Sequence, residues 1–418
     1  MARGRALFFL HKQPYPPIDS TKFRVYRSVI EQLSDFQRDF FIVTWESANV
    51  ESQRGLERLG NVQCHALPRW RLLFNILKRA FSVRPWQTEM LFEPKIERRF
   101  HALLEDADVV YVHTLRLGRY LERLPERLRR KIILDMNDSF ARHYLRSWRY
   151  YPFAQRLLVL LEGLKFKRYE RKMVALFEHV TIIGHDDSSF VTASNRTQNQ
   201  LVVLYPPVPV RQAIVTQRPL DGVVNLYFLG NLRYYPNREG IEWFLRTIWP
   251  LLHAQIPQTR LYIIGNVESR LYRRYRSREG IEWTGYCSDD NLEALLERMH
   301  VFVSPVRIGS GIQAKIIEAL LTGKPVLAAA EATSWVRHFP DIAGLFRVRS
   351  TNPSAWVEAM REILAGYDQV CSEMCSERMR TFLVRTFGID RAAEQYRAIA
   401  EKIATSTPVD KQVRGNAH

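Results

Sequence analysis

Short apolar runs recur along the chain, and stretches with helical periodicity separate them. The runs lie at 6–10, 40–44, 109–113, 131–135, 225–229, 260–264, 301–305 and 325–328. Apolar runs of this length, bounded by turn residues, are typical of buried parallel strands. Between two of them, apolar residues at 241, 244, 245 and 248 follow the spacing of one helix face. The alternation predicts doubly wound parallel sheets, whose ligands collect at the carboxyl ends of strands.

The chain is long enough for two such domains. It has 418 residues, of which 46% are hydrophobic, and the proline-rich stretch 206–209 lies near its middle. We therefore expect an N-terminal domain over 1–206 and a C-terminal domain over 207–385. A helix over 386–404 is expected to pack back on the N-terminal domain, and the polar tail 405–418 is expected to be disordered. The run at 6–10 is too short for a membrane span or a signal sequence.

The loop after the run at 301–305 has the composition of an anion site. Gly309 and Gly311, on either side of Ser310, allow backbone N–H groups to face inward, and a helix is expected to begin near Ile312 and Gln313. The first turn of a helix offers unpaired N–H groups and the positive end of its dipole. This pattern predicts phosphate binding.

Charged side chains flank that loop. Arg307 would bind phosphate as a fork and Lys315 as a point charge, while Glu318, one helical turn beyond, could accept from ribose hydroxyls. A nucleoside diphosphate fits this set. The alternative is an ordinary βαβ unit whose charges are solvated.

The stretch 318–326, EALLTGKPV, resembles the C-terminal signature of group 1 (family 4) glycosyltransferases of the GT-B fold. The resemblance implies two Rossmann-like domains facing a central cleft, with the nucleotide-sugar donor on the C-terminal domain. Family members have a Glu-x7-Glu element, and here Ser310 stands where the first Glu is usual. That Glu usually helps to hold the donor sugar.

Other segments are similar to donor-side motifs of the same family. Gly230 and Asn231 end one apolar run and precede Arg233 and Asn237, in a stretch that resembles the family's opening G-x-x-x-x-x-P-N. Many relatives have a Lys in this turn, where this chain has Arg233 and Asn237. The resemblance also implies donor contacts for two residues of later turns: Gly265 and Tyr286. A structural glycine at a strand end is the alternative for each turn alone.

The loop at 13–24, QPYPPIDSTKFR, resembles the opening of a subgroup associated with exopolysaccharide synthesis. Lys22 and Arg24 of this loop could bind anionic substrate, or they could be a basic pair on a surface helix. The subgroup usually has Gly where Ser20 stands.

Polar residues end two apolar runs of the N-terminal half. His113 ends one, and Asp135 and Asp138 follow the other in the stretch DMNDS. Asp138 could accept or orient an attacking hydroxyl, with Asp135 in support, and His113 is a catalytic candidate because of its place at a strand end. Asp138 and Ser139 could instead cap a helix, and His113 could be an ordinary loop histidine.

The charge of the chain is strongly basic and uneven. The net charge is +17, and residues 1–210 hold 34 Lys and Arg against 22 Asp and Glu. Basic and aromatic residues alternate over 69–79 and 142–151. Such stretches suit an anionic membrane surface, and a solvated basic helix face is the alternative. Nucleic acid is not expected as a partner, because no nucleic-acid motif accompanies the charge. The four cysteines show the spacing of neither a zinc site nor a disulfide framework.

These features predict a cytoplasmic glycosyltransferase, peripheral at the inner face of the plasma membrane. It would move a hexosyl or related group from a nucleotide sugar to a glycan or lipid-linked acceptor in bacterial exopolysaccharide or cell-surface glycan synthesis. The resemblance implies retention at the anomeric carbon. No metal and no other cofactor is expected, since Arg307 and Lys315 supply charge to the leaving diphosphate. Two alternatives are a GT-B-fold nucleotide-sugar epimerase and a noncatalytic subunit that binds nucleotide sugars or polyanions.

Overall fold

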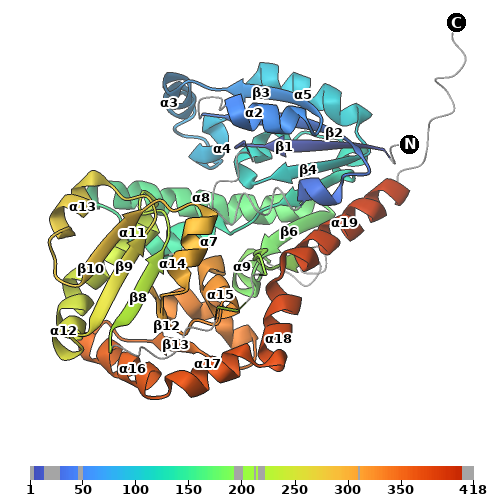
Figure 1. The fold of residues 1–418 in the computed structure, drawn as a ribbon. Coiled ribbons are helices and arrows are strands. Elements are labelled where there is room, and N and C mark those ends of the chain that lie inside the picture. The colour runs from blue at the N-terminus through green and yellow to red at the C-terminus, as the bar shows by residue number, and fades with distance from the viewer. Residues whose placement is uncertain are drawn as a thin grey trace, which may run out of the picture. The chain divides into compact units, whose positions relative to one another are not determined.

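The structure is a computed structural model that describes residues 4–13, 29–45, 50–192, 201–210, 213–214, 222–308 and 311–406. The chain forms two compact units. Unit 1 comprises the residues up to 207 and those from 390 on, and unit 2 comprises residues 208–389. In each unit, helices flank one parallel sheet (Figure 1).

Unit 1 is built on a seven-stranded sheet with the order β3-β2-β1-β4-β5-β6-β7. Its strands are β1 (Arg5–Leu10), β2 (Gln37–Thr44), β3 (Asn61–Ala66), β4 (Val109–His113), β5 (Ile132–Asp135), β6 (His179–Ile183) and β7 (Leu201–Leu204). The chain adds strands first on one side of β1 and then, from β4 on, on the other. The order therefore reverses between β1 and β4.

The helices of unit 1 connect these strands. They are α2 (Val50–Glu57), α3 (Arg69–Lys78), α4 (Trp86–Met90), α5 (Pro94–Asp106), η1 (Leu115–Tyr120), α6 (Glu126–Arg129), α7 (Phe140–Ser147), η2 (Trp148–Tyr150), α8 (Phe153–Leu176), α9 (His185–Val191) and the C-terminal α19 (Ile389–Ser406).

The core of unit 1 forms where these helices cover the sheet. Phe9 of β1 stacks on Phe100 of α5 at 4.1 Å between ring centroids and meets Tyr120 of η1 edge to face at 5.3 Å. All three side chains are buried. The almost uniformly apolar strands that the sequence showed are thus explained by burial on both faces of a parallel sheet.

The C-terminal helix α19 lies beside β6 in Figure 1, far from it in sequence. Buried Tyr396 of α19 meets Tyr111 of β4 edge to face at 5.7 Å, and its hydroxyl lies 3.5 Å from Thr181 Oγ1 of β6. The helix extends to Ser406, so its last two residues fall in the range where the sequence suggested a disordered tail. Residues 407–418 lie outside the described residues.

Unit 2 repeats the plan with six strands in the order β10-β9-β8-β11-β12-β13. Its strands are β8 (Val224–Leu229), β9 (Thr259–Ile264), β10 (Ile281–Gly285), β11 (Val301–Ser304), β12 (Val326–Ala329) and β13 (Leu345–Val348). Here the strand order reverses between β8 and β11, which are neighbours in the sheet. In open α/β sheets, ligands bind outside the carboxyl ends of the strands at such a reversal.

Ten helical segments cover the sheet of unit 2 in its described part. They are α11 (Tyr235–Trp243), η3 (Phe244–Ile248), α12 (Trp249–Gln255), α13 (Ser269–Tyr275), α14 (Asp289–Leu296), α15 (Ala314–Leu321), η4 (Ala330–His338), α16 (Pro353–Ala365), α17 (Tyr367–Cys375) and α18 (Glu377–Phe387). Buried Trp356 of α16 packs edge to face against Trp243 and Phe244, with centroids 5.7 and 5.6 Å away. The fold class predicted from the sequence, with two doubly wound parallel sheets, is confirmed.

Among the helices that the structure describes, none combines the length and apolar character needed to cross a membrane.

Candidate active site

The turns after β8 and β9 pack against each other at the edge of the unit 2 sheet where ligands are expected. Gly265, after β9, has a φ of +125°, and a Cβ at this position would lie 2.3 Å from the carbonyl oxygen of Gly230. Only glycine fits such a position. The sequence named both glycines as donor-side residues, and the structure brings them together.

Lys315 of α15 points toward the start of α11. Its Nζ donates to Asn237 Oδ1 at 2.8 Å and lies 4.3 Å from the centroid of the Phe228 ring. Burial lowers the pKa of Lys315 to about 7, and nearby Glu318 opposes that shift. A lysine so placed is a charge that a bound anion would stabilise, since the protein surrounds it with an aromatic face and a neutral amide oxygen.

Asn237 also stabilises the turn between β8 and α11. Its Nδ2 donates to the carbonyl oxygen of Asn231 at 3.0 Å, and the backbone N–H of Arg233 donates to Asn231 Oδ1 at 2.9 Å. The side chain of Arg233 is exposed. Asn237 therefore connects the turn that follows β8 to Lys315. In this way, donor-side residues predicted from two distant segments of the sequence lie close together.

Arg307 has a carboxylate partner that the sequence did not suggest. Its guanidinium donates to Glu239 of α11 and lies 4.3 Å from the centroid of the Trp243 ring. Gly240 permits this arrangement, because a Cβ there would lie 2.7 Å from the carbonyl oxygen of Pro305. Glu239 lies only two residues after Asn237 in the predicted helix, but its pairing with a residue 68 positions away is set by the tertiary structure.

The remaining predicted donor residues lie around this cluster. Gln313 Oε1 accepts from Ser304 Oγ at 3.2 Å. The residue occupies the N-cap position of α15, without a side-chain capping bond, and the helix begins at Ala314, two residues later than Ile312. Gly311 has a φ of +80°. Tyr286 follows β10 and is 64% exposed, so a flat ligand could stack on it. Gly309 and Ser310 lie outside the described residues.

In unit 1, a buried pair occupies the ends of neighbouring strands β4 and β5. His113 and Asp135 are register partners, and His113 Nδ1 lies 2.6 Å from Asp135 Oδ2. The hydroxyl of Tyr111 donates to the same oxygen at 2.5 Å, and that of Thr181 donates to Oδ1 at 3.0 Å. Burial alone would raise the pKa of Asp135, but the charge of His113 and these hydrogen bonds lower it below its ordinary value. The pair fixes the imidazole in one orientation.

A second histidine, which the sequence did not suggest, stacks on this pair. His11 directly follows β1, and its ring is 5.8 Å from that of His113 at an interplanar angle of 10°. Its Nε2 lies 3.2 Å from a guanidinium nitrogen of Arg116, whose Nε donates to Gln87 at 2.8 Å. Both histidines thus lie at the reversal point between β1 and β4. In the sequence, only the position of His11 directly after an apolar run could have suggested that it lies near the site.

Asp138 lies in a tight turn beyond β5. Asn137 adopts a φ of +61°, and its Nδ2 donates to Asp138 Oδ2 at 2.8 Å. Ser139, and not Asp138, caps α7 by accepting from the backbone N–H of Arg142 at 3.0 Å. Asp135 supports this turn indirectly, since its Oδ1 accepts from the backbone N–H of Asn137 at 3.1 Å.

Buried carboxyl groups underlie the Asp138 turn. Glu170 of α8 accepts from Ser139 Oγ at 2.7 Å, and Asp187 of α9 accepts from the backbone N–H of Ser139 at 2.9 Å and from Arg142 at 2.6 Å. Burial raises the pKa of Glu170 to about 8, and burial together with the nearby charge of Asp138 raises that of Asp187 to about 7. No role for Glu170 was expected from the sequence.

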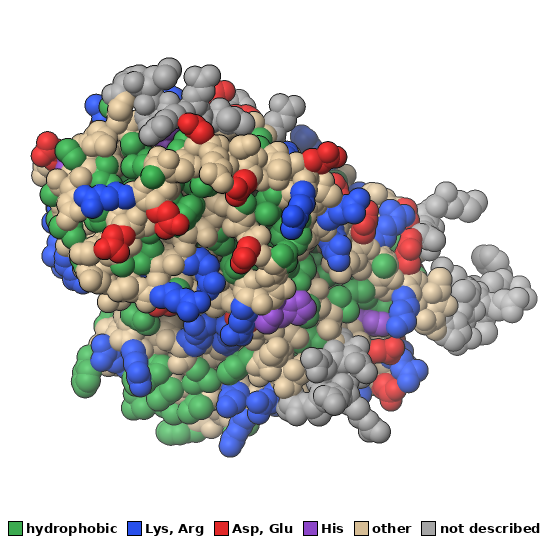
Figure 2. Space-filling view, turned by 90° about the horizontal axis from the view of Figure 1, so that it is seen from below, with side chains coloured by type: hydrophobic (Ala, Val, Ile, Leu, Met, Phe, Trp, Pro, Cys, Tyr) green, Lys and Arg blue, Asp and Glu red, His purple; other side chains and the backbone are tan. Residues whose placement is uncertain are grey.

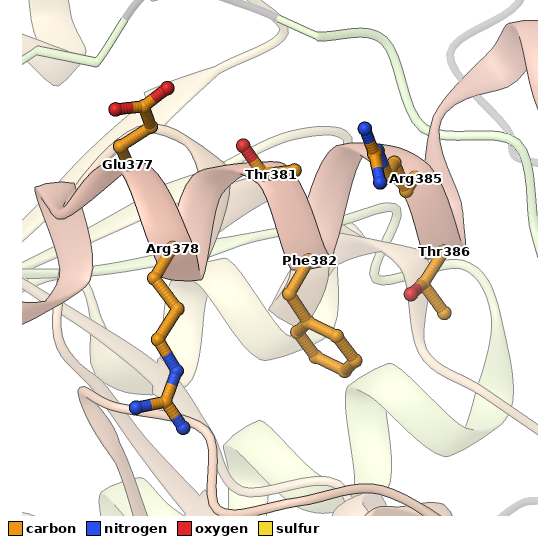
Figure 3. Close-up of a pocket in the computed structure, with 6 residues that line it drawn as sticks. All are labelled: Glu377, Arg378, Thr381, Phe382, Arg385 and Thr386. Atoms are coloured by element: carbon orange, nitrogen blue, oxygen red, sulfur yellow. The ribbon is translucent and has the colours of Figure 1, made fainter.

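Lys22 and Arg24 lie outside the described residues, so their role stays a prediction. A surface hollow elsewhere in unit 2 contains none of the predicted residues. Its lining comes entirely from α18, where Arg378, Phe382 and Thr386 point to one side of the helix and Glu377, Thr381 and Arg385 to the other (Figure 3).

Comparisons with known proteins address the class of the chain. Residues 224–366, in unit 2, match the family model described as glycosyl transferases group 1. The structure of HepE of Anabaena in complex with UDP-glucose has a TM-score of 0.60 and 12% sequence identity, over 96% of this chain and 100% of that one. The likeness, with the two parallel sheets, defines a two-domain α/β protein of the GT-B fold.

Curated relatives agree with this class. A 44.6 kDa protein in the cps region of Klebsiella pneumoniae is 21% identical over 301 residues, 70% of this chain and 74% of that protein. A phosphatidyl-myo-inositol mannosyltransferase of Propionibacterium freudenreichii is 31% identical over 102 residues, 24% of each chain. Residues 224–366 therefore form a domain similar to group 1 glycosyltransferases, as the sequence motifs predicted.

Proposed function

We propose that this enzyme moves a sugar, with retention at the anomeric carbon, from a nucleotide sugar to a glycan or lipid-linked acceptor for bacterial exopolysaccharide or cell-surface glycan. Its class is that of the hexosyl and related glycosyltransferases. This proposal is supported by the relative from the cps region, by the mannosyltransferase relative and by the HepE structure in complex with UDP-glucose. The observation that carries the proposal is Lys315, held against Asn237 and Phe228 at the strand reversal of the group 1 domain.

The chemistry follows from the charges of unit 2. When the bond between the anomeric carbon and the phosphate oxygen breaks, negative charge grows on the leaving nucleoside diphosphate. Lys315 would neutralise that charge most directly, because its ammonium group donates to a neutral amide oxygen, whereas Arg307 is already paired with Glu239. A preorganised cation in a partly buried site stabilises such charge far better than one in water. Glu318, on the same helix, would accept from the ribose hydroxyls.

Unit 1 would hold the acceptor. The acceptor oxygen bonds to the anomeric carbon and its proton passes to the leaving phosphate oxygen, so the protein need not supply a strong base. Asp138, in its constrained turn, and His113, oriented by Asp135, would orient the attacking hydroxyl. Lys22 and Arg24 would add positive charge for an anionic acceptor or for phosphate.

The first test is a thermal-shift screen of nucleoside diphosphates and their sugars. A ligand at 100 times its dissociation constant should stabilise the protein by about 2.7 kcal/mol. The stabilising nucleotide sugar is then incubated with the enzyme and a bacterial lipid extract, and the products are separated. Sugar in the lipid fraction supports transfer. An epimerised nucleotide sugar with no sugar in lipid would indicate the epimerase alternative, and binding without any turnover would indicate a noncatalytic subunit.

The same assay tests the prediction that no divalent metal is needed. The cations of unit 2 would already supply charge to the diphosphate, so transfer should continue in EDTA at its original rate. Loss of transfer in EDTA that manganese restores would contradict this.

A further inference from the structure

Most of the large apolar side chains exposed in the described part of the chain belong to two segments of unit 1. The first comprises α3 and the residues just after it, and its exposed apolar residues are Trp70, Leu73, Phe74, Leu77, Phe81 and Val83. The second comprises η2 and the first half of α8, and its exposed apolar residues are Tyr150, Phe153, Leu157, Leu158, Leu161 and Leu164. Within α3 and α8 themselves, the exposed apolar residues recur at the spacing of one helix face: Trp70, Leu73, Phe74 and Leu77 in α3, and Phe153, Leu157, Leu158, Leu161 and Leu164 in α8.

The first half of α8 is apolar without contributing to any core. Residues 157–161 read LLVLL, yet none of them is buried, and Phe153 is 87% exposed. The buried residues of α8 begin only at Glu162. Exposed apolar surface of this extent on a folded protein marks an interaction site.

Trp86 joins the two segments into one surface. Its indole Nε1 donates to the carbonyl oxygen of Ala80, just after α3, at 3.0 Å, and its ring lies 3.9 Å from Lys165 Nζ of α8. The backbone N–H groups of Trp86 and Gln87 donate to Glu162 of α8 at 2.8 and 3.0 Å. We call the exposed residues of the two segments the α3–α8 face.

The charge around this face is of one sign. Residues 58–88 and 140–161 contain no Asp or Glu, whereas both stretches contain several Arg or Lys, of which Arg69, Lys78 and Arg149 are exposed. In the space-filling view, apolar side chains with Lys and Arg side chains among them gather toward one lower corner of the surface (Figure 2). The acidic residues beside the face, Glu89, Glu93 and Glu162, are buried or paired with Arg. An apolar face whose exposed charged side chains are basic is complementary to anionic lipid, into which aromatic and aliphatic side chains insert at headgroup depth.

We propose that the α3–α8 face docks on an anionic lipid surface, with the exposed side chains of α3 and α8 inserted at the level of the headgroups. A second copy of this chain fits less well, because an isologous contact would place basic residues of one copy against those of the other. Docking would bring unit 1, the proposed acceptor unit, to the membrane that carries a lipid-linked acceptor. The docking itself needs neither donor nor acceptor, so its test is independent of the proposed transfer.

The test is cosedimentation of the full chain with vesicles of phosphatidylcholine alone or mixed with an equal part of phosphatidylglycerol. We expect binding to the mixed vesicles that weakens as salt is raised, and little binding to phosphatidylcholine alone. Hydrogen exchange of the bound protein should show protection in α3 and in the first half of α8. Equal binding to both kinds of vesicle, or protection confined to unit 2, would overturn the proposal.

Two variants separate the contributions of the apolar and the basic side chains to vesicle binding. Phe153→Ser with Leu157→Ser removes exposed apolar surface, and Arg69→Gln with Lys78→Gln and Arg149→Gln removes exposed charge. The charge set avoids Arg71 and Arg79, which pair with Glu93 and Glu89 at 2.6 and 3.3 Å. Each variant should bind mixed vesicles at least about tenfold more weakly. Each basic residue near such a surface contributes a factor of about five, and the apolar pair would lose the free energy of burying a Phe and a Leu side chain among the lipids.

The controls remove the same kinds of side chain elsewhere. They are Val50→Ser with Tyr272→Ser, and Arg260→Gln with Arg276→Gln and Arg378→Gln, all at exposed positions. These controls should bind vesicles like the parent, and all variants should keep the parent's melting temperature. Equal loss in controls and test variants would contradict the proposal. Dimers that form with rising protein concentration in lipid-free solution, and that Phe153→Ser with Leu157→Ser abolishes, would also contradict the proposal. They would show that the α3–α8 face binds a second copy.

Discussion

Lys315 is the residue on which the proposed chemistry most depends. Its ammonium group donates to Asn237 and faces the ring of Phe228, and burial lowers its pKa to about 7. Free enzyme near neutral pH is therefore a mixture of charged and neutral Lys315. A bound diphosphate would favour the charged form, so binding and protonation of this residue should be linked.

We predict that affinity for the nucleotide sugar falls as pH rises above about 7, by up to about tenfold per pH unit, because binding must then take up a proton. Titration calorimetry with the nucleotide sugar at several pH values measures this affinity. The diphosphate of a nucleotide sugar is a diester that does not itself ionise near neutral pH, so it adds no pH dependence of its own. Lys315→Arg should bind without this pH dependence, and Lys315→Met should bind weakly at every pH. A parent affinity that stays constant from pH 6 to 9 would show that Lys315 does not contact the diphosphate.

Asp135 is expected to act through His113. Asp135→Asn would leave the pair without its charge and should lower turnover by at least about tenfold, while donor affinity, which depends on unit 2, stays unchanged. Thr181→Val is the matched control, because it removes a hydrogen bond to the other oxygen of Asp135 and should cost about 1 kcal/mol of stability with little effect on turnover. If the two variants lose turnover equally, Asp135 has only a structural role.

At the scale of the elements, α7, α8 and α9 meet over buried carboxyl groups. The pKa of Glu170, near 8, and that of Asp187, near 7, both lie above the ordinary values of 4.5 and 3.8. A carboxyl group with a raised pKa in the folded state favours folding most at low pH, and this contribution is lost as pH rises through the folded-state value. The window of loss runs from about pH 4 to about pH 8.

We therefore predict that the melting temperature falls between pH 6 and pH 8.5, with a contribution on the order of 1 kcal/mol per pH unit from Glu170. Glu170→Gln, which resembles the protonated carboxyl, should reduce the slope and be more stable than the parent above pH 8. Glu126→Gln, at an exposed surface pair, should leave the slope unchanged. A Glu170→Gln protein with the parent's slope would show that Glu170 does not titrate in this range.

The sequence predicted the elements well where a pattern is local. The run at 109–113 is β4 to the residue, and the helix expected near 312 begins at Ala314. The strands β3, β6, β7, β10 and β13 were not named among the apolar runs. These short strands are recognisable only once a neighbouring strand pairs with them.

The candidate site shows the same division. Lys315, Asn237, Gly230 and Gly265 were found from motifs and do converge. Pairs that form only in the tertiary structure were not predicted. Examples are Arg307 with Glu239, and His113 with Asp135, which was expected to support Asp138. The register of β4 on β5 makes that pair. No local pattern encodes which residues of two parallel strands become neighbours.

At the scale of the whole molecule, the two units divide the proposed work. Unit 2 has the group 1 domain and the Lys315 cluster, and unit 1 has the His113–Asp135 pair, the Asp138 turn and the α3–α8 face. The excess of positive charge in the first half of the sequence follows this division, since part of it surrounds the α3–α8 face. Donor chemistry and membrane docking should accordingly be separable by mutation.

The central claim is that the cations of unit 2 drive transfer from a nucleotide sugar. The most direct measurement is the rate at which labelled sugar passes from the nucleotide sugar to the lipid fraction, for the parent and for Arg307→Ala with Lys315→Ala. We expect the parent to transfer sugar and the double variant to be slower by about 100-fold or more, measured at a temperature at which both proteins remain folded. A double variant that transfers sugar at the parent's rate would contradict the account.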